Sequence, residues 1–187
     1  MAAMSAAPRP PGPVRHVVLV GLMGVGKTTV GLLLAGSLGW PLADSDSEIE
    51  AREGASVREI QRRRGAPALH ALEAAVLLEQ LHAPGRSVIC AAASTIEDAR
   101  CRHALRQTDV LAVWLSATLE TMVARYDRDP HRPRYPEGTR AALAAQLAAR
   151  CERYEAVAAM TIESDARTPA AIAAAIERQL ARWEAPA

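Results

Sequence analysis

The stretch that decides the fold is Val17-Val18-Leu19-Val20-Gly21-Leu22-Met23-Gly24-Val25-Gly26-Lys27-Thr28. Its first four residues are aliphatic with no polar face, which is typical of a central parallel strand buried on both sides. The next eight follow the pattern G-x-x-x-x-G-K-T, and residues 28–38 then favour a helix that ends at Gly39. This strand–turn–helix order is the context in which the pattern binds phosphate, and it disfavours the alternative of a chance glycine turn.

Lys27 stands out against the composition of the chain. It is the only lysine, since 21 of the 22 basic residues are arginine, and Phe and Asn are absent as well. The joint scarcity of these three residue types indicates a GC-rich coding bias. Arginine is a poor replacement in a phosphate loop, because its broad planar head cannot take the place of a compact ammonium under the β- and γ-phosphates. A lysine at this position therefore favours a working phosphate loop.

The same loop predicts which residues contact a nucleotide. Backbone N–H groups and the positive end of the following helix would hold phosphate oxygens, and Lys27 would reach the β- and γ-phosphates as a catalytic residue. The hydroxyl of Thr28 would ligate Mg²⁺, so we expect ATP and Mg²⁺ to bind here. The predicted nucleotide-binding residues of the loop are Gly24, Val25, Gly26, Lys27, Thr28 and Thr29.

Length and charge limit the class of protein. With 187 residues, 50% of them apolar, the chain suits one domain that buries a core without disulfides or a structural metal. The net charge of +1 gives no reason to expect nucleic acid or an anionic membrane as a partner. The three cysteines follow no Cys-x-x-Cys spacing, and the histidines show no zinc-type pairing. We expect a monomer that acts on a small molecule.

The first 13 residues differ from the rest. They contain Pro8, Pro10, Pro11 and Pro13, and they lack the apolar segment of a signal peptide. No apolar stretch of the sequence approaches the length of a bilayer span. We interpret residues 1–13 as a disordered leader and expect the protein to stay in the cytoplasm.

The remaining sequence alternates strands with helices. Short apolar runs predict further strands at 41–43, 87–90, 110–115 and 160–163. Helical patterns predict helices at 47–53, 57–64, 68–81, 118–126, 139–157 and 169–183. This alternation predicts one α/β domain of the P-loop NTPase type over residues 14–187, with three layers and a parallel sheet covered by helices on both faces. The charged, proline-rich stretch at about 126–138 is expected to form a mobile lid.

Several short motifs follow the loop in a fixed order. Asp44-x-Asp46 precedes Ile49-Glu50, and a segment from Gly65 to Glu73 comes next. An Arg132-Pro133 pair and an R-x-x-x-Y motif from Arg150 to Tyr154 complete the series. In this order and spacing the chain resembles the shikimate kinase family from about residue 17 to residue 180.

The resemblance implies roles for three charged residues. Asp44 would hold the hydration shell of Mg²⁺ opposite Thr28, and Asp46 would orient or deprotonate the hydroxyl of the acceptor. Arg132 would move in with the lid and neutralise charge in the transition state. Each of these residues also has a purely structural alternative. Either aspartate can be a helix N-cap or a solvated acid, and Arg132 can be a solvated loop residue.

The resemblance also implies contacts to adenine and to the acceptor. Arg125 and Pro169 stand where the family sandwiches the adenine ring, although they can equally be a surface residue and a helix N1 proline. Arg150 stands where the family binds an anionic substrate, with a helix-surface arginine as the alternative. The predicted substrate-binding residues are Asp46, His70, Ala92, Ala93 and Arg150.

Three positions depart from the family pattern. Leu69-His70 stands where the family has the arginine that binds the substrate carboxylate. Ala66 stands where the family has the acid of a Gly-Glu pair. Ala91-Ala92-Ala93 stands in place of a Gly-Gly-Gly loop, and alanine resists the conformations that such glycines supply. We therefore expect a reshaped acceptor site, at which His70 is either a hydrogen-bond donor to the substrate or a structural residue.

Together these features predict a shikimate kinase-like enzyme that transfers the γ-phosphate of ATP directly to a hydroxyl of a small polar metabolite. The acceptor is shikimate or, given the departures, a different hydroxylated compound. Two alternatives stay open. One is a kinase for another acceptor, such as gluconate or a nucleoside monophosphate. The other is a nucleotide-binding protein that has lost turnover.

Overall fold

The computed structural model describes residues 13–128 and 135–185. The predicted leader, apart from Pro13, lies outside the described residues. Part of the predicted lid lies outside them too, and so does its Arg132. In the described part of the chain, no helix is long and apolar enough to cross a membrane.

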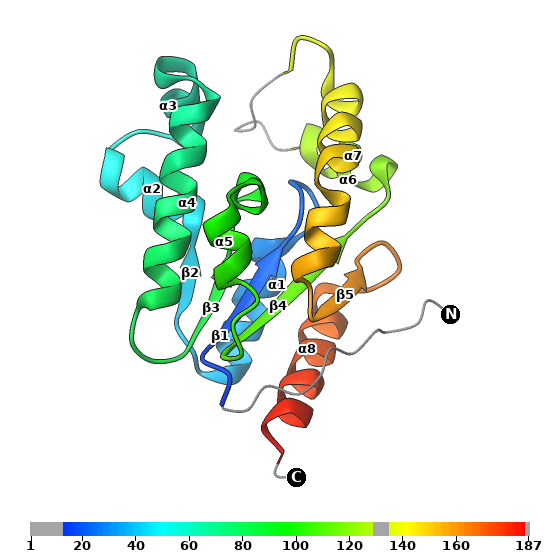
Figure 1. The fold of residues 1–187 in the computed structure, drawn as a ribbon. Helices are drawn as coiled ribbons and strands as arrows, with labels where there is room; N and C mark the ends of the chain where they lie inside the picture. Colours follow the sequence, from blue (N-terminus) through cyan, green and yellow to red (C-terminus); the bar gives the residue numbers. More distant parts are fainter. Residues whose placement is uncertain (1–12, 129–134, 186–187) are drawn as a thin grey trace.

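A five-stranded sheet forms the centre of the molecule, in the order β2-β3-β1-β4-β5 (Figure 1). Every neighbouring pair of strands is parallel, as the sequence predicts. The strands are β1 (His16–Val20), β2 (Leu42–Asp44), β3 (Ser87–Cys90), β4 (Val110–Ser116) and β5 (Met160–Glu163). Each lies within two residues of its predicted bounds, and the apolar runs of β1, β3 and β4 are almost wholly buried, as expected for the central strands of a parallel sheet.

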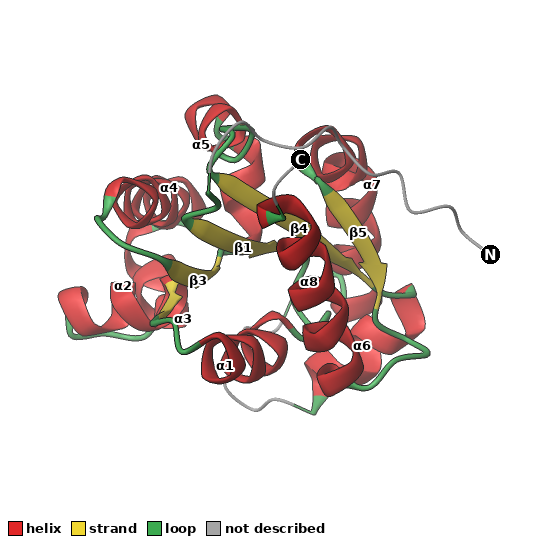
Figure 2. Cartoon of the chain, turned by 90° about the horizontal axis from the view of Figure 1, so that it is seen from below, coloured by secondary structure: helices red, strands yellow, loops and turns green. Residues whose placement is uncertain are grey.

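Helices cover both faces of the sheet (Figure 2). On one face lie α1 (Lys27–Leu38) and α8 (Pro169–Glu184), which pack against each other. On the other face lie α4 (Ala66–His82), α5 (Ala99–Ala104) and α7 (Thr139–Val157). The predicted three-layer α/β fold is therefore confirmed.

The remaining elements lie around the carboxyl ends of the strands. They are α2 (Ser45–Glu53), α3 (Val57–Arg64), the 3₁₀ helix η1 (Ala93–Glu97) and α6 (Leu119–Asp127). Neither η1 nor α5 was expected from the sequence. Both are too short for a helical repeat of apolar residues to stand out, and 3₁₀ turns have weak sequence preferences.

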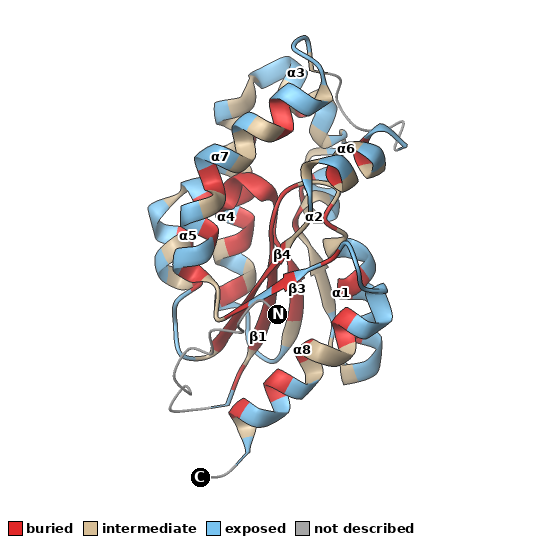
Figure 3. Ribbon diagram, turned by 90° about the vertical axis from the view of Figure 1, so that its right-hand side faces the viewer, coloured by how far each residue is buried: buried red, intermediate tan, exposed pale blue. Residues whose placement is uncertain are grey.

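β1 is the most enclosed strand. All five of its residues are buried, and it lies between β3 and β4 (Figure 3). The connections after β1 and β3 leave in opposite directions across the sheet, so β1 is next to the point where the strand order reverses. In open α/β sheets, ligands bind outside the carboxyl ends of the strands at such a point. The glycine-rich loop after Val20 begins there.

α1 packs closely on the sheet through a glycine. A Cβ added to Gly31 would lie 2.5 Å from Cys90 Sγ and 3.2 Å from Leu42 Cδ1. Gly36, on the exposed side of the same helix, has nothing within 4 Å of such an added atom. The helix that follows the phosphate loop is therefore held against β3 and β2 by a contact that admits no side chain at Gly31.

We predict that Gly31→Ala destabilises the fold while Gly36→Ala stabilises it. Overpacking at residue 31 should outweigh the helix propensity gained, for a net loss of about 1–2 kcal/mol. Gly36→Ala should gain about 0.5–1 kcal/mol, because it only restricts the unfolded chain. Urea unfolding of both variants measures the difference, and equal effects of the two substitutions would contradict this packing.

Candidate active site

The glycine-rich loop joins β1 to α1 and is shaped by close contacts. Gly24 has a φ of +82°, and an added Cβ would lie 2.8 Å from the Met122 carbonyl oxygen of α6. Gly26 is the N-cap residue of α1, and no side chain of the described residues caps this helix end. The dipole of α1 favours an anion at this helix end.

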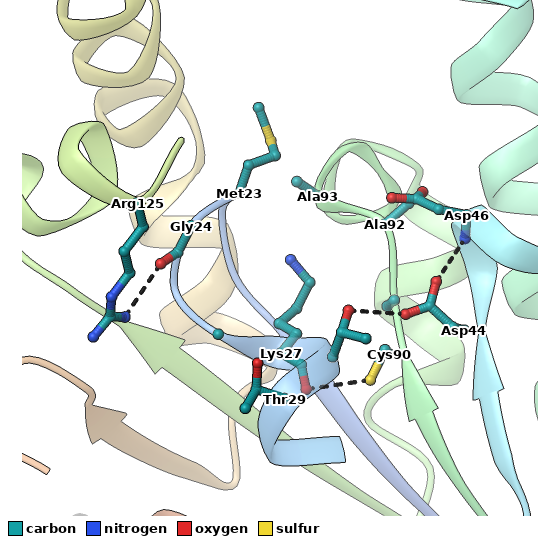
Figure 4. A pocket seen from close by; sticks show the side chains of 13 residues that line it. Met23, Gly24, Lys27, Thr29, Asp44, Asp46, Cys90, Ala92, Ala93 and Arg125 are labelled. Carbon is teal, nitrogen blue, oxygen red and sulfur yellow. Dashed lines mark hydrogen bonds between the residues drawn. The ribbon is translucent and has the colours of Figure 1, made fainter. Parts of the chain in front are cut away.

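Lys27 lies at the start of α1 beneath the loop. Its Nζ donates to the carbonyl oxygens of Gly21 at 2.8 Å and Leu22 at 3.2 Å. In Figure 4 its side chain reaches into the cavity that the loop surrounds. The ammonium is therefore already at the place where a phosphate chain would meet the loop.

Asp44 ends β2 and uses its two carboxylate oxygens in two directions. Oδ2 accepts a hydrogen bond from Thr28 Oγ1 at 3.0 Å, and Oδ1 accepts from the backbone N–H groups of Asp46 and Ser47 at 3.1 and 3.3 Å (Figure 4). Asp44 is thus the N-cap of α2. The N-cap alternative is correct for this residue, yet the same carboxylate also meets the hydroxyl predicted to bind Mg²⁺.

A hydroxyl and a carboxylate are hard oxygen ligands that suit Mg²⁺. Within the described residues, no group of three or more His, Cys, Asp or Glu side chains could hold a metal ion alone. This composition fits Mg²⁺ in particular, because that ion keeps several waters and takes its other ligands from substrate phosphates. The residues present are therefore compatible with a Mg²⁺–nucleotide complex.

Asp46 lies in a different conformation from the one expected. Its position in the sequence predicts that it lies before a helix beginning at residue 47, but it is in the first turn of α2, which begins at Ser45. The cause is the side chain of Asp44, which satisfies the N–H groups that an extended segment would leave to solvent. Asp46 nevertheless faces the cavity together with Lys27 (Figure 4).

Two cavities meet at this point. The first, of about 310 Å³, is lined by the phosphate loop, Thr28, Asp44, Arg125 and residues 90–93. The second, of about 260 Å³, lies between α2, α3, α4, η1 and α7. Met23, Asp46 and Ala93 line both cavities. We call the first the phosphate cavity and the second the acceptor cavity.

The acceptor cavity contains a buried carboxyl, which the sequence motifs include as the end of the segment from Gly65 to Glu73 but to which no role was assigned. Glu73 of α4 is only 8% exposed, and Ser94 Oγ donates a hydrogen bond to it. Burial, with a smaller contribution from the charge of Asp46, raises the pKa of Glu73 to about 7, although the hydrogen bond from Ser94 acts in the opposite direction. The sequence contained a signal for this burial, because Glu73 lies four residues from both Leu69 and Leu77 and so falls on the apolar face of the predicted helix.

Arg150 and His70 also line this cavity, and both contact Glu97 at the end of η1. Arg150 Nε donates to Glu97 Oε1 at 2.8 Å, and Nη1 donates to Gln146 Oε1 at 2.9 Å. His70 Nδ1 lies 3.6 Å from Glu97 Oε2, and burial lowers the pKa of this histidine. Since Arg150 is only 6% exposed, the surface-arginine alternative is wrong. Glu97 was missed because η1 was not expected.

The two residues predicted to contact adenine lie in different environments. Arg125 is half-buried and donates from Nη1 to the carbonyl oxygens of Gly24 and Val25 and to Ser164 Oγ, so it holds the loop from behind. Pro169 is exposed in the first turn of α8 and is not among the described residues that line the phosphate cavity. Its position agrees with the helix N1 alternative.

The segment from Ala91 to Ala93 lines the phosphate cavity, and Ala93 lines the acceptor cavity as well. No non-glycine residue in the described ranges has a positive φ, so these alanines adopt ordinary backbone conformations. Thr95 donates to the Ala92 carbonyl, and Tyr154 Oη donates to the Ala93 carbonyl at 2.9 Å. The segment is thereby fixed as the start of η1 rather than as an open glycine loop.

Comparison with known proteins gives consistent matches. A family model described as shikimate kinase matches residues 23–181. A shikimate kinase of Pseudomonas syringae pv. syringae is 37% identical over 168 residues, which cover 89% of this chain and 96% of that protein. The structure of an Acinetobacter baumannii shikimate kinase in complex with shikimate has a TM-score of 0.85 and 32% identity, covering 92% of this chain and 96% of that one.

A gluconokinase structure from Sinorhizobium meliloti is similar with a TM-score of 0.55 at 19% identity, covering 94% of each chain. At this identity the likeness concerns the fold alone.

The raised pKa of Glu73 predicts a pH-dependent stability. Between pH 4.5 and about 7 the unfolded chain loses the proton while the folded chain keeps it, so stability falls as pH rises through this window. From pH 5 to pH 8, Glu73 should contribute a loss of about 2–3 kcal/mol that Glu73→Gln abolishes. Urea unfolding of both proteins at the two pH values checks this, and parallel pH profiles would contradict it.

Proposed function

The chain belongs to the shikimate kinase family of ATP-dependent small-molecule kinases, and we propose that it transfers the γ-phosphate of ATP directly to a hydroxyl of a small polar acceptor. The observation that carries the proposal is the position of Asp46. Its side chain lines both the phosphate cavity and the acceptor cavity. A group at that border is where a general base or orienting residue for the acceptor hydroxyl must lie.

On the donor side, the proposal assigns binding to the phosphate loop and to Lys27. The N–H groups at the start of α1 and the ammonium of Lys27 would hold the phosphates in line with the acceptor. Thr28 and Asp44 would hold Mg²⁺ through oxygen ligands and water. When bound, this ion would neutralise part of the phosphate charge.

On the acceptor side, Asp46 would accept a hydrogen bond from the hydroxyl and take its proton as transfer proceeds. No covalent intermediate with the chain is required, because positioning and charge neutralisation supply most of the catalysis in phosphoryl transfer. Arg132, which lies outside the described residues, is proposed to add positive charge on lid closure, in keeping with its place in the sequence motif.

We propose that shikimate is a poor substrate or has been replaced by another hydroxylated compound. The Acinetobacter baumannii relative was solved with shikimate, but here His70 stands where the family has a carboxylate-binding arginine. Losing one charge-assisted hydrogen bond weakens binding by about 1.5–3 kcal/mol, or roughly ten- to hundredfold. Of the alanines that replace the glycines, Ala93 lines the same cavity as His70, and Ala91 and Ala92 line the neighbouring phosphate cavity.

An ADP-release assay over shikimate and a panel of polyols and hydroxy acids tests this proposal. We expect an acceptor other than shikimate to give the highest kcat/KM. Turnover of shikimate at an ordinary kinase rate, about 1–100 per second, would refute the substrate change. Thermal stabilisation by ATP without ADP release from any acceptor would instead favour a binding protein that has lost turnover.

The role of Asp46 is tested by Asp46→Asn, with Glu48→Gln as a matched control. Both residues lie in the first turn of α2, but Glu48 is partly exposed, pairs with Arg52 and lines neither cavity. Asp46→Asn should lower kcat roughly 100- to 10,000-fold and leave the affinity for ADP unchanged. Glu48→Gln should leave both unchanged. A kcat for Asp46→Asn close to that of the control would exclude a role in proton transfer.

A further inference from the structure

The acceptor cavity contains few positive groups to receive an acid. Among the described residues that line it, Arg150 is the only arginine or lysine. Asp46 lines it as well, and so does Glu73, whose pKa of about 7 leaves it partly ionised at neutral pH. The net charge of Arg150, Asp46 and Glu73 together is therefore zero or negative before any substrate binds.

The single arginine is already neutralised by the chain itself. Its Nε donates to Glu97 at 2.8 Å, so a carboxylate of the chain already pairs with the guanidinium. Gln146 accepts from Nη1. Because the Arg150 side chain is only 8% exposed, water contributes little to its solvation, and it depends on these partners. An incoming carboxylate would have to displace Glu97 or share the cation with it.

Glu97 reaches His70 too. Its second oxygen lies 3.6 Å from His70 Nδ1, so one carboxylate lies beside both side chains that stand at the anion-binding positions of the cavity. Burial lowers the pKa of His70 by more than the charge of Glu97 raises it, and Arg150 also lowers it, so the imidazole is neutral at neutral pH. His70 is then a hydrogen-bonding group and not a second cation.

From these contacts we infer that Glu97 determines acceptor specificity, and that the acceptor is an uncharged polyhydroxylated molecule without a carboxylate. Gln61, His70, Ser94 and Gln146 offer the cavity neutral hydrogen-bonding groups that suit hydroxyls. Leu69 and Val57 offer apolar surface for the carbon skeleton. The inference rests on the proposed kinase function and specifies its substrate class.

The test compares shikimate with its uncharged analogue, in which a hydroxymethyl group replaces the carboxylate. In wild type, kcat/KM for the uncharged compound should be at least roughly tenfold higher. Glu97→Gln removes the internal counter-ion of Arg150 and should shift the ratio toward the acid by roughly ten- to hundredfold. Glu152→Gln, an exposed change of equal charge on α7, should leave the ratio unchanged.

A wild-type preference for the acid, or no shift in Glu97→Gln, overturns the inference. Because wild type alone gives the first ratio, the test does not depend on the folding of the variant. Calorimetric binding of the two compounds in the presence of ADP and Mg²⁺ provides a readout without turnover. Selective binding of the uncharged compound with no ADP release would refute the proposed kinase function but support the inferred preference for an uncharged ligand. Turnover of the acid alone would support the kinase function but refute the preference for an uncharged acceptor. Failure of the uncharged compound to bind would refute that preference as well.

Discussion

The arrangement of the site depends on the carboxylate of Asp44. One oxygen caps α2 and so fixes where that helix begins, and the other binds Thr28 on α1. These two helices carry the groups on which the proposed chemistry relies, Lys27 and Thr28 on α1 and Asp46 on α2. A displacement of Asp44 would therefore change the distance between the phosphate loop and Asp46. Because Asp44 is the last residue of β2, the sheet sets this distance rather than a flexible loop.

The acceptor cavity is governed by a second constraint, the cost of burying charge. Arg150 and Glu73 are both nearly buried, and the protein treats them differently. Arg150 cannot give up its proton, so it needs a counter-ion, which Glu97 supplies. Glu73 can hold its proton at neutral pH, so it needs only the hydroxyl of Ser94. Each partner comes from η1, so this short helix sets the charge of the cavity.

Much of the fold and the donor half of the site could be predicted from sequence, because each depends on local signals. The run at residues 17–20 can only be a buried strand, and the glycine pattern after it fixes the turn and the start of α1. The acceptor half could not be predicted to the same degree. Glu97 and Arg150 are 53 residues apart and form a pair only through tertiary packing. Asp46 was expected just before a helix beginning at residue 47, since the capping by Asp44 depends on where β2 ends.

This division has a physical consequence for how the acceptor site can change. The donor groups sit on elements anchored directly to the sheet, where a single added methyl at Gly31 would meet Cys90 and Leu42. Apart from Asp46 on α2, the charged and titratable groups of the acceptor side lie on η1, α4 and α7. A substitution at residue 70 or 97 alters the charge of the acceptor cavity without moving any backbone that holds the phosphates. Acceptor specificity can therefore change in this fold while the geometry of the phosphate loop stays the same.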